Sequence, residues 1–294
     1  MNKYALGWIP DYPDFRDYTE DTIEVKEILE PSGLPRPTSR GKARKSASLP
    51  AATDLRRWCS PVEDQGQIGS CTAQAGVGVI EYYERKAFGR HIDASRLFLY
   101  KVTRNLMKMK GDTGAYLRST IGAMVLFGVP PEEYWKYVVA DYDKEPTAFL
   151  YSFAQTYQSI SYFRLDPPGT TQDALLAMIK TLLSKGIPSM FGFTVYNSIG
   201  QAAGTGKIPF PTSAERVLGG HAIDAVGYDD AMKIKNNGPG GIETVGALLI
   251  RNSWGTAWGD KGYGWLPYDY VLKGLAVDWW ALLKNEWVNT GVFN

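Results

Sequence analysis

A cysteine lies where a glycine-containing loop meets a stretch of helical character. The loop, from Asp64 to Thr72, reads Asp-Gln-Gly-Gln-Ile-Gly-Ser-Cys-Thr, and the helical stretch follows from Ala73 to Phe88. The first turn of a helix carries unpaired backbone N–H groups and the positive end of the helix dipole, which favour a thiolate. Cys71 is therefore a candidate nucleophile, and the side-chain amide of Gln65 is a candidate donor to an oxyanion.

The alternative for Cys71 is a buried structural thiol, because free cysteine often packs as a small hydrophobe. Two later stretches favour the nucleophile. One of the two histidines of the chain, His221, lies in an apolar run from Leu218 to Tyr228, and Asn252 follows in a run that carries two tryptophans. A cysteine, a histidine and an asparagine in this chain order are typical of a thiol protease.

These motifs resemble the papain family of cysteine proteases, especially its bacterial members, over roughly Asp54 to Leu266. The resemblance implies an α+β fold of two lobes, a helical lobe and a β-rich lobe, with the active-site cleft between them. It also implies a role for each site residue: Cys71 as nucleophile, His221 as its acid/base partner, Asn252 to orient the imidazole, Gln65 as oxyanion donor, and Trp254 to cover the His–Asn hydrogen bond.

Two positions depart from the usual family pattern. Ile68 stands where a cysteine is usual, and Thr72 stands in place of the usual tryptophan after the nucleophile. The usual disulfides are also absent, because Cys59 is the only cysteine besides the nucleophile. We expect Cys59 to be a buried structural thiol.

The resemblance further implies residues that contact the substrate. Gly114 is a candidate to pair with the substrate backbone, and the alternative for it is an ordinary turn leading into a helix. A pocket around the second substrate residue would be lined by Tyr116, Gly192 and Ala222.

Composition narrows the classes of partner. The chain has 294 residues, of which 44% are hydrophobic and 21% charged, and its net charge is +1, so we expect a soluble globular protein, a monomer, and no nucleic-acid partner. No run of about 18 apolar residues predicts a membrane span, and no signal peptide is evident. The compartment is left open, with the cytoplasm as default and non-classical export as the alternative. No metal or organic cofactor is expected.

The rest of the pattern divides the chain into helical and β-rich parts. Two further helices are predicted over 94–105 and 116–127, and a fourth, over 172–185, interrupts the β-rich part. Strands are predicted over 159–165, 188–196, 221–228, 247–252 and 263–266. The tryptophans near the end, Trp279, Trp280 and Trp287, are expected to serve core or lobe packing.

The first fifty residues read differently. Trp8 to Phe15 is aromatic and rich in proline, and Pro35 to Pro50 is a basic linker. We expect residues 1–50 to be a pro-like segment with its linker and 51–294 the catalytic domain, with a helical lobe at about 60–156 and a β-rich lobe at about 157–294. The segment either crosses the cleft as an inhibitory peptide or packs as a tail on the surface.

The predicted function is that of a cysteine endopeptidase acting on peptides or proteins through a thioester. If the N-terminal segment crosses the cleft, the chain is a zymogen. One alternative is another thiol acyl transferase, such as a peptide ligase or an amidase, because the steps up to the thioester are the same. A second is a non-catalytic binding module, which we would expect to have lost the cysteine or the histidine.

Overall fold

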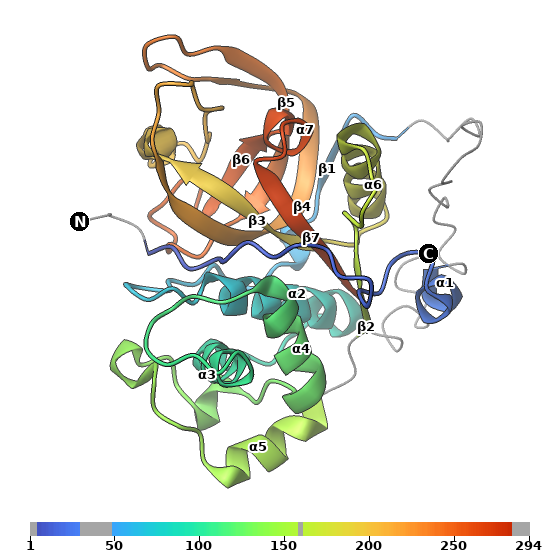
Figure 1. The fold of residues 1–294 in the computed structure, drawn as a ribbon, viewed down its shortest axis with the longest axis vertical. Coiled ribbons are helices and arrows are strands. Elements are labelled where there is room, and N and C mark those ends of the chain that lie inside the picture. The colour runs from blue at the N-terminus through green and yellow to red at the C-terminus, as the bar shows by residue number, and fades with distance from the viewer. Residues whose placement is uncertain (1–4, 30–48, 158–160, 284–294) are drawn as a thin grey trace.

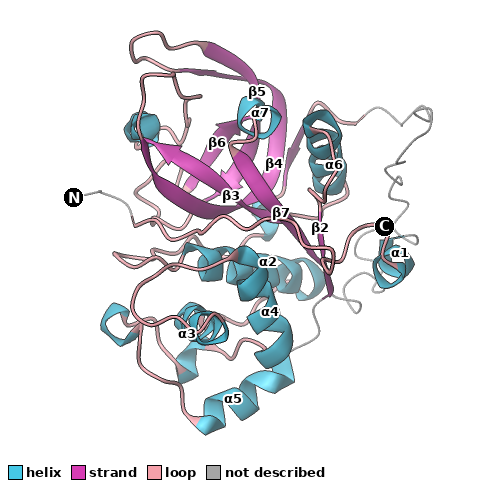
Figure 2. Ribbon diagram, viewed as in Figure 1, coloured by secondary structure: helices cyan, strands magenta, loops and turns pink. Residues whose placement is uncertain are grey.

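The computed structural model describes residues 5–29, 49–157 and 161–283. Helices gather in one half of the molecule and strands in the other (Figures 1 and 2), which is the α+β arrangement of two lobes that the sequence predicts. Most of the predicted linker, from Pro35 to Pro50, lies outside the described residues, as does Trp287. In the part of the chain described, no helix is long and apolar enough to cross a membrane.

The helical lobe contains the three helices that the sequence predicts. Each begins within two residues of its predicted start, and α4 ends at Gly128, whose φ of 77° favours glycine. A further short helix, α5, is not predicted. The bounds are α2 Cys71–Phe88, α3 Arg96–Leu106, α4 Leu117–Phe127 and α5 Ala148–Ala154.

The β-rich lobe is a seven-stranded antiparallel sheet of order β2-β7-β3-β4-β5-β6, with β1 paired to β4. The predicted strands are confirmed, whereas β1 and β7 are missed. The bounds are β1 Ala52–Asp54, β2 Ser161–Arg164, β3 Ser189–Tyr196, β4 Val217–Lys235, β5 Glu243–Arg251, β6 Tyr263–Pro267 and β7 Ala276–Leu283. The remaining helices are α1 Ile23–Leu29, α6 Gln172–Ser184 and α7 Tyr268–Leu272, and the 3-10 turns are η2 Arg56–Trp58, η3 Glu132–Tyr134, η4 Val139–Asp141, η5 Gln155–Tyr157 and η6 Asn197–Ala202.

Helix α2 joins the two lobes. Most of its residues are buried, and it packs against β4 as well as against α3 and α4. Small residues make this approach possible: a Cβ at Gly78 would lie 2.4 Å from Nη1 of Arg251 on β5. Because α2 lies against the sheet, its first residue, Cys71, is positioned beside β4.

The N-terminal segment runs between the lobes rather than over the outside (Figure 1). The amides of Gly7 and Trp8 donate to the carbonyl of Gly220 on β4, at 3.2 and 3.1 Å. On the helical side, Ala115 donates to Gly7 (2.8 Å) and accepts from Ile9 (3.0 Å). The segment therefore bonds to both walls of the space above Cys71.

Candidate active site

Cys71 is the first residue of α2, where the sequence predicts a nucleophile at a helix start. Its side chain is fully buried. The backbone of Ala222, the residue after His221, lies close enough to the thiol to lower its pKa. The fold therefore brings Cys71 from the helical lobe against the strand that carries the histidine.

His221 and Asn252 are held together on the β-rich lobe. Nε2 of His221 lies 2.8 Å from Oδ1 of Asn252, which also accepts from the amide of Ser253 at 2.8 Å. Since Oδ1 only accepts, Nε2 is the donor. Nδ1 then has no hydrogen-bond partner among the described residues and is the nitrogen left to face a thiol.

Trp254 shields this pair. Its ring stacks on the imidazole of His221, with centroids 4.4 Å apart and planes inclined by 20°. An aromatic face over the ring keeps water from the hydrogen bond to Asn252 and fixes the orientation of the imidazole. The placement agrees with the covering role that the resemblance implies.

Gln65 is oriented by the β-rich lobe. The backbone N–H of Gln65 donates to the carbonyl of Ser253 (2.9 Å). The side-chain oxygen Oε1 of Gln65 accepts from the hydroxyl of Ser253 (2.6 Å). This fixes the side-chain NH₂ group, which donates to Ile68 at 2.9 Å and to the carbonyl oxygen of Ala5 at 3.3 Å. An N-terminal carbonyl thus occupies the donor expected to serve an oxyanion.

The predicted substrate contacts are also occupied by the N-terminal segment. Gly114, with φ of 73°, faces Gly7 so closely that a Cβ would lie 2.1 Å from the Gly7 carbonyl oxygen. The backbone pairing itself is made by the next residue, Ala115, rather than by Gly114. Tyr116 follows as the N-cap residue of α4.

Gly192 and Ala222 are paired neighbours on β3 and β4. The indole of Trp8 lies on Gly192, where a Cβ would come within 1.9 Å of Cε2, and against Gly220, where it would come within 2.7 Å of Cε3. Trp8 therefore occupies the place where the resemblance puts a substrate pocket. Gly220 was not among the predicted site residues, although it stands next to His221 in a Gly-Gly pair.

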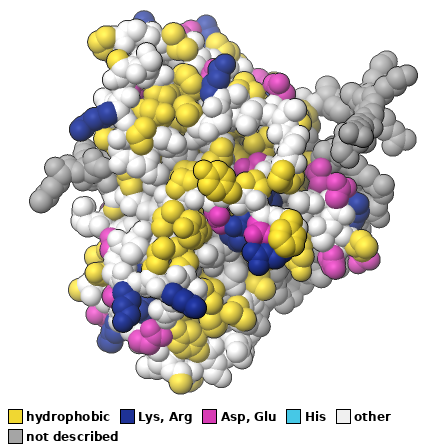
Figure 3. All heavy atoms as spheres, viewed as in Figure 1, with side chains coloured by type: hydrophobic (Ala, Val, Ile, Leu, Met, Phe, Trp, Pro, Cys, Tyr) yellow, Lys and Arg dark blue, Asp and Glu magenta, His cyan; other side chains and the backbone are white. Residues whose placement is uncertain are grey.

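Burial sets the charge state of the site in this covered arrangement. Burial raises the pKa of Cys71 to about 11, although nearby backbone groups, including those of Ala222 and Gly7, lower it in part. It lowers the pKa of His221 to about 4, against the hydrogen bond to Asn252. The sequence predicts a thiolate, but thiol and imidazole are both neutral here because the segment excludes water from them. No histidine side chain shows on the face drawn in Figure 3.

Two other sequence expectations concern residues outside the triad. Cys59 is a free, buried thiol, as expected, and burial raises its pKa to about 11. Among the residues that the structure describes, no group of three or more His, Cys, Asp or Glu is arranged to hold a metal ion.

Comparison with known proteins identifies similar chains. A sequence profile described as papain family cysteine protease matches residues 49–273. A peptidase C1-like protein of Acanthamoeba polyphaga mimivirus is 33% identical over 94% of this chain and 86% of its own length. Cathepsin K of Gallus gallus is 28% identical over 84% of this chain and 70% of its own.

A solved structure is similar along nearly the whole chain. The crystal structure of xylellain, a cysteine protease from Xylella fastidiosa, superposes with a TM-score of 0.74 at 32% identity. The alignment covers 95% of this chain and 96% of xylellain.

Proposed function

This chain belongs to the papain family of cysteine proteases, and from that membership we propose that it is an endopeptidase working through a thioester acyl-enzyme. The observation that carries the proposal is the 2.8 Å bond to Asn252 from Nε2 of His221, which lies on the strand against which the helix that begins at Cys71 packs. That bond commits one ring nitrogen to orientation and leaves the other for proton exchange with the thiol.

The reaction begins when the Cys71 thiolate attacks the peptide carbonyl carbon and a C–S bond forms. The oxyanion rests on the side-chain N–H of Gln65 and the backbone N–H of Cys71. The imidazolium of His221 gives its proton to the leaving nitrogen as the C–N bond breaks. Neutral His221 then takes a proton from water, which attacks the thioester and releases the acid and the thiolate.

We propose that residues 1–50 restrain this activity and that 51–294 form the catalytic domain, with lobes at about 60–156 and 157–294. Gly7 passes directly over Gly69, where a side chain on Gly7 would lie 2.0 Å from the Gly69 carbonyl oxygen. Ala5 accepts from Gln65, and Trp8 fills the pocket at Gly192. A tethered segment has an effective concentration of roughly millimolar, so even weak contacts keep it in place.

Ionic contacts add to this restraint. Arg118 of α4 bonds to Asp17 at 2.7 and 2.8 Å, to Asp11, and to the Tyr12 carbonyl at 2.8 Å. Figure 3 shows acidic and basic side chains side by side near the middle of the face that it draws. The segment is thus bonded to the enzyme body well beyond the reacting groups.

The catalytic proposal is tested with two cysteine variants in a protein that starts near Ser46. Cys71→Ser should abolish hydrolysis of a fluorogenic peptide, and Cys59→Ala, which changes the other buried thiol, should leave most of it. Equal losses in both variants would contradict the assignment of the nucleophile. Adding a free amine to the assay separates hydrolysis from transfer, because a ligase would give the amide product.

The restraint is tested by comparing this shortened protein with the full chain. The shortened protein should have the higher kcat/KM on a short substrate, and a peptide of residues 1–38 should inhibit it. If the shortened protein folds, hydrolyses no faster and is not inhibited by the peptide, the segment has only a structural role.

A further inference from the structure

Strands β3 and β7 fall out of register beside the pocket that Trp8 fills. Met190 pairs with Trp280 and Gly192 with Val277, so two residues of β7 face the single residue Phe191. This is a β-bulge, a feature that redirects a side chain and often lies near active sites. The first of the two bulged residues is Asp278.

Asp278 has the backbone conformation of such an inserted residue. Its φ is 61°, in the left-handed region that few residues other than glycine adopt. The carboxylate of Asp166 stabilises the bulge, because it accepts from the amides of Asp278 (2.7 Å) and Trp279 (3.1 Å). A strained residue held by a dedicated partner points to a role for its side chain.

The carboxylate of Asp278 is fully buried, and its two oxygens differ. Oδ1 accepts from the indole of Trp280 (2.8 Å) and pairs with Arg164 (3.3 Å), so the enzyme body satisfies it. Oδ2 accepts from the indole N–H of Trp8 at 3.1 Å. In the described part of the chain, no other group donates a hydrogen bond to Oδ2.

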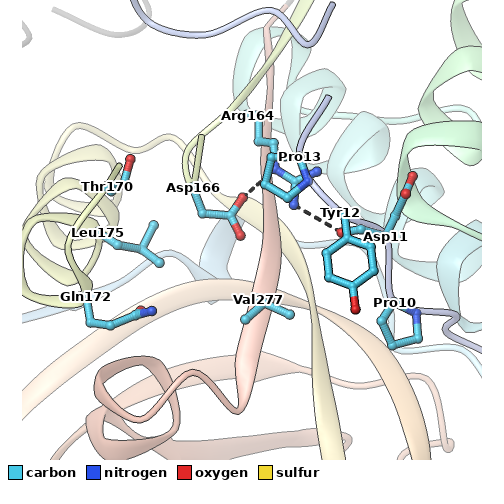
Figure 4. Close-up of a pocket in the computed structure, with 10 residues that line it drawn as sticks. All are labelled: Pro10, Asp11, Tyr12, Pro13, Arg164, Asp166, Thr170, Gln172, Leu175 and Val277. Atoms are coloured by element: carbon cyan, nitrogen blue, oxygen red, sulfur yellow. Dashed lines mark hydrogen bonds and ion pairs between the residues drawn. The ribbon is translucent and has the colours of Figure 1, made fainter. Parts of the chain in front are cut away.

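Figure 4 shows Arg164 and Asp166, the two residues that hold Asp278 and its bulge in place. Arg164 reaches Asp166 on one side and the backbone of Asp11 on the other, and Val277 of β7 lines the same cavity. Next to the segment at this point is a cavity of ≈ 280 Å³. When the segment leaves, Arg164 and Asp166 stay with the body, and the pocket keeps its buried acceptor but loses its donor.

We propose that Asp278 determines specificity in this pocket by selecting a large side chain with an N–H donor at its far end, tryptophan above all, at the second residue on the acyl side of the cleaved bond. This deepens the proposed protease function and rests on it. The absence of side chains at Gly192 and Gly220 gives room for two fused rings, and Oδ2 of Asp278 gives their N–H its partner.

The segment shows which neighbouring position the pocket serves. Gly7 lies over Gly69, close to the nucleophile, and Trp8 is its direct neighbour. A side chain in this pocket therefore belongs to the residue next to the one at Cys71. The acyl side follows from the resemblance, which gives the pocket at Gly192 and Ala222 to the second substrate residue. A cation would be a poorer occupant than an indole, since Arg164 already pairs with the same carboxylate.

The test uses the full chain with Trp8→Ala, so that the pocket is not filled by its own segment. Substrates of the form acyl-X-Arg-aminomethylcoumarin carry at X tryptophan, 2-naphthylalanine, phenylalanine, leucine or arginine. Ratios of kcat/KM between substrates cancel the fraction of enzyme that is open. We expect tryptophan to exceed 2-naphthylalanine, which has two fused rings but no N–H, by about tenfold or more, as a lost hydrogen bond to a buried charge requires.

The variant Asp278→Asn should bring that ratio to within about threefold of unity, because the acceptor loses its charge. Asparagine tolerates positive φ, so the bulge is kept, and thermal unfolding checks the fold. The matched control is Asp173→Asn, an exposed acid on α6, which should leave the ratio unchanged.

The outcomes separate this inference from the proposed function. If no substrate is cleaved, the protease assignment fails. If all are cleaved but tryptophan and 2-naphthylalanine are equal, or arginine is preferred to tryptophan, or Asp278→Asn lowers every rate alike, Asp278 does not select the substrate.

Discussion

Replacing Trp8 by alanine in the full chain should release the active site. Trp8 is 5% exposed, and it supplies both the side chain in the pocket and the hydrogen bond to Asp278. Truncating a buried tryptophan to alanine costs about 3–5 kcal/mol. Every 1.4 kcal/mol is tenfold in an equilibrium, so the ratio of covered to open enzyme should fall by about a hundredfold to a thousandfold or more.

The measured gain has a ceiling, because activity cannot exceed that of enzyme that is fully open. The assay is kcat/KM on a short fluorogenic peptide for the full chain, its Trp8→Ala variant and the protein that starts near Ser46. The matched control is Tyr12→Ala, an aromatic residue of the same segment that is 88% exposed and should change the rate little. The reasoning fails if Trp8→Ala is no faster than Tyr12→Ala while the shortened protein is clearly faster than both.

Three further predictions concern charge and the reacting pair. In the full chain carrying Cys59→Ala, alkylation should show a Cys71 thiol that ionises only near pH 11, since burial raises its pKa, whereas the shortened protein should show a thiolate at far lower pH. Asp17→Asn weakens the bonds to Arg118, so it should raise the basal activity of the full chain and make that activity less dependent on salt. The control is Asp21→Asn, which removes an exposed ion pair with Lys26 and should leave the basal activity unchanged. In the shortened protein, His221→Ala should cost as much as Cys71→Ala, and the double variant no more than either, because the two side chains act as one unit; additive losses would argue against a shared ion pair.

Local signals in the sequence were sufficient for most helices and strands. Helix α2 could be predicted from the turn glycines before it, and α6 from the threonines before it, of which Thr171 is the N-cap and accepts from the amide of Ala174 at 3.3 Å. Helical patterns in one part of the chain and β-rich runs in the other predicted the two lobes, and the resemblance implied the cleft between them. Helix and strand patterns depend on near neighbours in the chain.

The features that were missed depend on distant contacts. Strand β7 carries Trp279 and Trp280, whose burial was expected, but its bulge at Asp278 exists only through Asp166 and the register of β3. The neutral state of Cys71 was also missed, because it too depends on a distant part of the chain. A helix N-terminus favours a thiolate, but burial by a segment some sixty residues earlier in the chain outweighs it.

Covering of the site and ionisation of the pair are therefore linked. The pKa of His221 falls from 6.5 to about 4 on burial, so its contribution to the covered arrangement is present above pH 6.5 and is lost as the pH falls toward 4. The pKa of Cys71 rises from 9.0 to about 11, so its contribution is present below pH 9.0 and is lost as the pH rises through 11. Both shifts favour the neutral pair, whereas catalysis needs the ion pair.

Asp278 does not oppose this linkage. Burial raises its pKa to about 6, but the hydrogen bond from Trp8 of the segment lowers it, so that contact favours the ionised carboxylate. Removal of the segment from the pocket at Gly192 ends the burial that keeps Cys71 and His221 neutral, and so allows thiolate and imidazolium to form together.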